Sequence, residues 1–86
     1  MNYSVVWTSE AIEDFLELWL TSTEKTALTH DAEQIGEDLA KEPFAEKHEV
    51  FRGVGIAMHG RVGVEFRIGQ RSNVVTVVAA WLLADE

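Results

Sequence analysis

The chain has no cysteine, a single proline and few positive charges, and each shortage excludes a class of protein. Without cysteine there is no disulfide framework, no thiol catalysis and no cysteine-bound zinc. Fifteen acidic residues against seven lysines and arginines give a net charge of −8. The chain therefore lacks the basic surface that long-range attraction to nucleic acid requires, and an acidic surface favours a basic partner.

Long apolar runs and linkers are also missing. The longest apolar run, residues 74–83, contains Thr76 and is too short to span a bilayer. No cationic segment followed by an apolar core begins the chain, and no repeat or Gly/Ser-rich stretch divides it. We therefore expect one domain over residues 1–86, located in the cytoplasm and not bound to a membrane.

The acidic residues are concentrated in the first half of the chain. Residues 9–49 carry a net charge of −9, whereas residues 50–86 carry +1 and contain all four arginines. No set of His, Asp and Glu has the spacing of metal ligands, so we expect no metal site. The segment Gly53-Val54-Gly55 lacks the third glycine of a dinucleotide-binding loop and leads into a strand, so we expect no cofactor.

The N-terminal residues predict a strand followed by a helix. Apolar and polar residues alternate from Tyr3 to Trp7, as in a half-buried strand. Thr8 and Ser9 supply N-cap oxygens for the helix that follows. Apolar residues of 11–20 cover roughly 200° of the helix surface at 100° per residue. Because that arc is wider than one core contact requires, we expect this helix to contact the sheet and a second surface.

A second helix over residues 24–41 and three strands over residues 53–83 are predicted next. The helix should end before Pro43, because proline disfavours helical dihedral angles in the preceding residue. The last strand, residues 74–83, is apolar on both faces, as in a central strand or one covered by a partner. The second helix has an apolar stripe at spacings of four, three and four, made of Leu28, Ala32, Ile35 and Leu39.

The apolar pattern of the first two of these three strands predicts how their residues pair in a hairpin. If Met58 faces Val62, the large apolar residues of both strands share one face, and residues 59–61 form a three-residue loop. The opposite face is then a shallow groove, which we interpret as a binding surface. Its predicted residues are Gly53, Gly55, Ala57, Gly63, Glu65 and Arg67, with His59 and Arg61 at the rim.

Several short segments carry a resemblance to a known family. They are Tyr3-x-Val5-x-Trp7-Thr8, Ser9-Glu10-Ala11, Leu39-Ala40-Lys41-Glu42-Pro43, Arg52-Gly53 and Arg61-Val62-Gly63-Val64-Glu65-Phe66-Arg67-Ile68. With the predicted order of elements, the sequence resembles the RelE/ParE toxin superfamily of bacterial type II toxin–antitoxin systems. The resemblance implies an α+β fold of order β-α-α-β-β-β, with a small, mainly antiparallel sheet and a two-helix hairpin on one face.

The resemblance also implies a function. The chain would be the toxin of a type II toxin–antitoxin module, neutralised by a cognate antitoxin. RelE-like members cleave mRNA on the ribosome with clustered basic residues that stabilise the phosphate. Arg61 matches the family's arginine at the start of the third strand and would face the phosphate, with Arg67 in support. His48 and His59 lie where some members place catalytic acids or bases.

The sequence departs from RelE-like members after the last strand. Trp81 is followed only by Leu82-Leu83-Ala84-Asp85-Glu86, without the family's basic, aromatic or histidine residues of that region. ParE-like members, described as gyrase poisons, do not depend on that nuclease cluster. Three alternatives stay open: a ribosome-dependent mRNA endoribonuclease, a poison of DNA gyrase, and a catalytically inactive interaction module of the same fold.

Several residues are also expected to contact protein partners. Trp19 and Leu20 lie in the wide apolar arc of the first helix, and Trp81 lies near the end of the last strand. We expect these residues and Glu65 to contact the antitoxin or another partner, because buried aromatic side chains contribute much of the binding energy of interfaces. A homodimer through the first helix or the last strand is the other expected assembly.

Overall fold

The computed structural model describes residues 2–45, 48–69 and 71–83. In this part of the chain the elements are β1 (Ser4–Trp7), α1 (Ser9–Thr21), α2 (Lys25–Lys41), β2 (Glu49–Phe51), β3 (Val54–His59), β4 (Val62–Gly69) and β5 (Val74–Leu82). The strands form one sheet in the order β1-β5-β4-β3-β2, in which β1 and β5 pair in parallel and all other neighbours are antiparallel. The predicted α+β class is confirmed.

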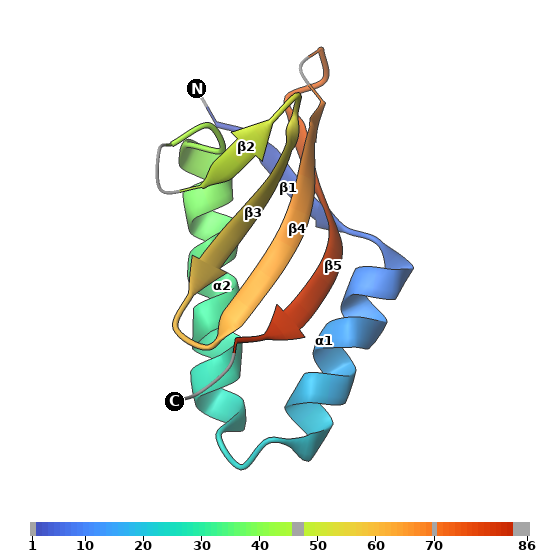
Figure 1. The fold of residues 1–86 in the computed structure, drawn as a ribbon, viewed down its shortest axis with the longest axis vertical. Coiled ribbons are helices and arrows are strands. Elements are labelled where there is room, and N and C mark those ends of the chain that lie inside the picture. The colour runs from blue at the N-terminus through green and yellow to red at the C-terminus, as the bar shows by residue number, and fades with distance from the viewer. Residues whose placement is uncertain (1, 46–47, 70, 84–86) are drawn as a thin grey trace.

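Both helices lie on one side of the sheet, as predicted (Figure 1). Helix α2 crosses behind β3 and β4, and α1 lies beside β5, so the face of the sheet toward the viewer has no helix on it. Neither described helix is long and apolar enough to cross a membrane. The sheet therefore has one face in the core and one face without a helical layer.

The helix termini follow the sequence signals. The Thr8 side-chain oxygen accepts a hydrogen bond from the backbone N–H of Ala11, at 3.1 Å, and so caps α1. Helix α2 ends at Lys41, two residues before the buried Pro43.

Helix α1 is also bonded to the sheet. The Asp14 carboxylate accepts a hydrogen bond from the backbone N–H of Ala80 at 3.2 Å. Ala80 lies in β5 beyond the residues that pair with β1, so this bond satisfies an N–H group that β1 does not reach.

The core lies between α2, the start of α1 and the central strands. Strand β5 lies between β1 and β4, so its apolar character on both faces is that of a central strand, as predicted. Ala32 of the predicted α2 stripe is only partly buried, whereas the other three members of the stripe are buried. The buried apolar residues are Ala11, Leu28, Ile35, Leu39, Ala57, Val62, Val64, Phe66, Ile68, Val75, Val77 and Ala80.

The predicted hairpin register is wrong by one residue. His59, not Met58, pairs with Val62, so the turn has two residues, Gly60 and Arg61. Gly60 has a φ of +59°, which glycine adopts without strain at the first position of such a turn. The shift moves His59 to the helical side of the sheet, away from the predicted rim.

Side-chain volume explains the observed register. Gly55 pairs with Phe66, and a Cβ at position 55 would lie 2.6 Å from Phe66 Cζ and 2.9 Å from Val50 Cγ2. The Phe66 ring thus occupies the space that the missing side chain leaves. Gly55 and Ala57 of the predicted glycine and alanine floor are therefore buried in the core, whereas Gly63 lies on the side of the sheet without a helix, as predicted.

The short edge strand β2 lies outside the strands that the sequence predicted. It joins β3 through a two-residue turn, with Phe51 paired to Val54. Both turn residues have positive φ, +56° at Arg52 and +78° at Gly53, as a type I′ turn requires. Arginine is uncommon at such a position, so the sequence carried little signal for this hairpin.

We predict that Gly55→Ala lowers the free energy of unfolding by about 1–3 kcal/mol, because the added methyl group overpacks the core against Phe66. The matched control is Gly36→Ala on α2, where a Cβ would meet nothing within 4 Å. That change should raise the stability by up to about 1 kcal/mol, because alanine favours helix more than glycine does. Urea unfolding of the three proteins measures both effects, and equal stabilities would contradict the register-setting contact.

Candidate functional site

Arg61 lies in the β3–β4 turn and contacts α2 and Glu24, the residue that precedes this helix. Its Nη1 atom lies 2.9 Å from Oε2 of Glu24, and its backbone N–H donates to Oδ2 of Asp31 at 3.1 Å. Gly60 approaches the Asp31 carboxylate so closely that a side chain at position 60 would collide with it. The turn is therefore fastened to the helical side of the molecule, and the guanidinium has a carboxylate partner.

Arg67 lies on the face of the sheet without a helix, whereas Arg61 contacts Glu24 and Asp31 on the helical side. It pairs with Val54 in the β3–β4 ladder, between the core residues Phe66 and Ile68, and its side chain is exposed. Six residues of strand separate it from Arg61, about 20 Å at 3.3 Å per residue. The two arginines expected to bind one phosphate are therefore not brought together.

His48 is a core residue. Its side chain is only 6% exposed, and its ring packs edge-to-face on Phe66 with centroids 5.8 Å apart. Its Nδ1 atom lies 3.3 Å from the carbonyl oxygen of Pro43, which accepts the hydrogen bond. The imidazole is therefore held inside the fold with a partner for Nδ1, and an acid–base role for His48 stays a prediction.

His59 lies close to residues of α2. Its ring lies 6.3 Å from that of His30, and its Nε2 atom lies 4.0 Å from Oδ1 of Asp31. Together with the contacts of Arg61, this places His30, Asp31, His59 and Arg61 near the N-terminal half of α2. Among the described residues, no group of three or more His, Asp or Glu is arranged to hold a metal ion.

The face of the sheet that carries no helix is rich in exposed apolar side chains, and we call it the open face. Phe51 is 73% exposed, and a hollow of about 330 Å³ lies beside it, lined in part by Val54, Ile56 and Glu65. Contiguous apolar surface of this kind is typical of interaction sites. The open face consists of Phe51, Val54, Ile56, Met58, Gly63, Glu65, Arg67 and Trp81.

Two of the predicted partner-binding residues lie on the open face. Trp81 pairs with Gly63, and its indole covers that glycine so closely that a Cβ there would lie 2.6 Å from Nε1. Glu65 is half-buried in β4, opposite Ile56 of β3. Residues 84–86, on which part of the comparison with RelE-like members depended, lie outside the described part of the chain.

The other two predicted partner-binding residues lie on α1. Trp19 links the two helices: its Nε1–H donates to the side-chain oxygen of Thr29 at 3.1 Å, and Lys25 Nζ lies 5.3 Å from the ring centroid. Leu20 is 66% exposed. Trp19 therefore has a structural role within the hairpin that the sequence did not indicate, whereas Leu20 is part of the surface.

The fold, a helical hairpin on a five-stranded sheet whose first and last strands pair in parallel, is that of the RelE/ParE toxins. A chain of the toxin–antitoxin complex RelBE2 from Mycobacterium tuberculosis has a TM-score of 0.79 at 22% identity, over 99% of this chain and 95% of that one. A chain of the P. aeruginosa ParDE system has a TM-score of 0.70 at 12% identity, over 95% of this chain and 97% of that one. The isolated E. coli RelE toxin has a TM-score of 0.67 at 14% identity, over 98% of this chain and 87% of that one. No protein-family model and no curated protein matches the sequence.

We predict that His48→Ala lowers the free energy of unfolding by about 2–3 kcal/mol, because it leaves a cavity beside Phe66. His30→Ala, which removes an exposed ring of the same chemistry, should change the stability by less than about 0.5 kcal/mol. Chemical denaturation of both variants at one pH checks the difference. A His48 variant as stable as the natural protein would mean that the imidazole is not part of the core.

Proposed function

We propose that the chain is the toxin component of a type II toxin–antitoxin module and is neutralised by a cognate antitoxin in the cytoplasm. The observation that carries the proposal is the likeness of fold along nearly the whole of both chains. One of these structures is the isolated E. coli RelE toxin, which contains no antitoxin. The shared fold is therefore that of the toxin and not of its partner.

The open face supports the proposal of a protein partner. A solvent-facing sheet surface with exposed Phe51, Val54 and Met58 costs solubility unless another chain covers it. We propose that an antitoxin segment lies on this face, with Trp81 as an apolar anchor. Glu65 and Arg67, of opposite charge on one strand, would fix the register of that segment.

We further propose that the toxin acts by binding a protein target, as a gyrase poison would, and not by cleaving RNA. Cleavage of RNA requires cations that converge on one phosphate in the transition state. Arg61 is paired with Glu24, Arg67 is about 20 Å away along β4 and His48 is buried. The net charge of −8 also opposes binding to RNA.

Expression of this chain alone in a bacterial host tests the proposal. We expect growth arrest with intact mRNA, because the target is a protein, and we expect co-expression of a neighbouring antitoxin gene to restore growth. Arg61→Ala should arrest growth equally, since the half-exposed ion pair with Glu24 that it removes is worth about 0–1 kcal/mol. Growth curves, RNA sequencing of cleavage ends and a gyrase supercoiling assay are the measurements.

Three outcomes would contradict parts of the proposal. Ribosome-dependent mRNA cleavage that is lost in Arg61→Ala would identify an endoribonuclease with Arg61 in its site. Loss of arrest in Arg61→Ala with intact mRNA would mean that Arg61 contacts the target. Normal growth with soluble, folded chain present would favour the catalytically inactive interaction module. Circular dichroism of the purified variant confirms that it is folded.

A further inference from the structure

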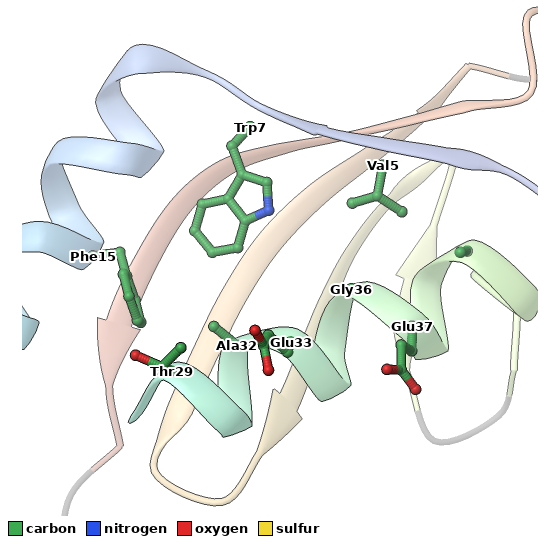
Figure 2. A pocket seen from close by; sticks show the side chains of 9 residues that line it. Val5, Trp7, Phe15, Thr29, Ala32, Glu33, Gly36 and Glu37 are labelled. Carbon is green, nitrogen blue, oxygen red and sulfur yellow. The ribbon is translucent and has the colours of Figure 1, made fainter. Parts of the chain in front are cut away.

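A groove of about 720 Å³ opens between α1, α2 and β1, on the helical side of the sheet (Figure 2). Val5 and Trp7 of β1 and Phe15 of α1 line it opposite α2. The rings of Trp7 and Phe15 meet edge-to-face, with centroids 6.0 Å apart and planes at 73°. One side of the groove is therefore a rigid apolar wall with two aromatic rings.

The floor of the groove consists of small residues of α2. Ala32, Gly36 and Ala40 are spaced four residues apart and lie on one face of the helix. A Cβ added at Gly36 would meet no other atom within 4 Å. Another chain can therefore approach the α2 backbone closely and contact the aromatic wall at the same time.

The rim of the groove is acidic. Glu33 and Glu37 lie one turn apart on α2 and are exposed. Within the described residues, neither carboxylate forms an ion pair or a hydrogen bond. Like charges at this spacing repel each other and destabilise a helix, so an occupant with positive charge would relieve the repulsion.

A second hollow, of about 340 Å³, adjoins the groove. It shares Thr29 and Glu33 with the groove, and its other lining residues are Trp19, Lys25, Thr26 and His30. Ile12 and Leu16 of α1, each 47% exposed, lie at helical angles adjacent to Phe15 and Trp19. The apolar arc of α1 therefore continues from the groove onto the exposed side of the helix. The stretch of α2 from residue 25 to residue 40 is about 22 Å long, the length of a helix of about 15 residues.

We propose that this groove binds a basic amphipathic segment of a partner protein, with apolar side chains against Trp7 and Phe15 and lysines or arginines against Glu33 and Glu37. Charge complementarity selects this occupant, because residues 9–49 have a net charge of −9. A phosphate backbone would be repelled, and a second copy of this chain would bring the same acidic helices. The proposal goes beyond the toxin function, since the groove lies on the opposite side of the sheet from the open face.

Peptide selection against the purified full-length chain tests the proposal. The probe is a displayed library of random 15-residue peptides in which basic and acidic residues are equally frequent. We expect the selected peptides to be net positive, with apolar residues at spacings of three and four. The best peptide is then synthesised, and its affinity is measured by calorimetry at two salt concentrations, where higher salt should weaken it.

Variants of the chain localise the binding. The double change Glu33→Gln and Glu37→Gln should weaken the best peptide at least tenfold, and Gly36→Leu, which fills the floor, should weaken it similarly. The matched control is Glu13→Gln with Glu17→Gln on the exposed side of α1, which changes net charge equally and should alter affinity less than twofold. Circular dichroism confirms folding; the glutamates are exposed, so their replacement leaves the core intact.

Selection of neutral or acidic peptides, failure to select any peptide, or equal binding to the rim and control variants would overturn the proposal. These outcomes do not depend on toxicity. A chain that binds the basic peptide but leaves growth unaffected would support the groove proposal and contradict the toxin function. A toxic chain that binds no peptide would support the toxin function and contradict the groove proposal.

Discussion

The contact between Phe66 and Gly55 decides how the two faces of this protein are composed. The phenylalanine ring fills the space above the glycine, and the β3–β4 register that results directs Ala57 and His59 toward α2. The same register directs Val54, Ile56 and Met58 to the other side, where no helix covers them. A slip by one residue would bury these three side chains and expose the glycine. The open face, the neighbours of His59 and the two-residue turn at Arg61 all depend on this packing.

The two surfaces with room for a partner differ in chemistry. The open face is apolar with one acid and one arginine near its centre, whereas the groove between the helices joins an aromatic wall to an acidic rim. Charged side chains also hold elements of the fold together: Asp31 accepts a hydrogen bond from the backbone of the β3–β4 turn, and Glu24 pairs with Arg61.

Much of the architecture was predictable from local signals, because helix periodicity, the Thr8 cap and Pro43 act within a few residues. The register was not, because the apolar pattern of residues 54–66 fits two pairings and only the volumes of Gly55 and Phe66 choose between them. The strand β2 was missed since its turn uses Arg52 with positive φ instead of asparagine. The surroundings of the candidate site residues could not be predicted: burial of His48 and pairing of Arg61 depend on residues distant in sequence, which spacing alone does not reveal.

The parallel pairing of β1 with β5 joins segments that lie about 70 residues apart in the sequence, since Ser4 lies opposite Val74. Both helices lie between these strands in the sequence, so a nascent chain presents its acidic helices and an unpaired first strand until β5 has left the ribosome. Contacts between residues so far apart close slowly compared with those of a helix or hairpin. The sheet is thus completed only after both helices have been synthesised, and a partner that recognises α1 and α2 would meet its binding elements before the protein is able to act.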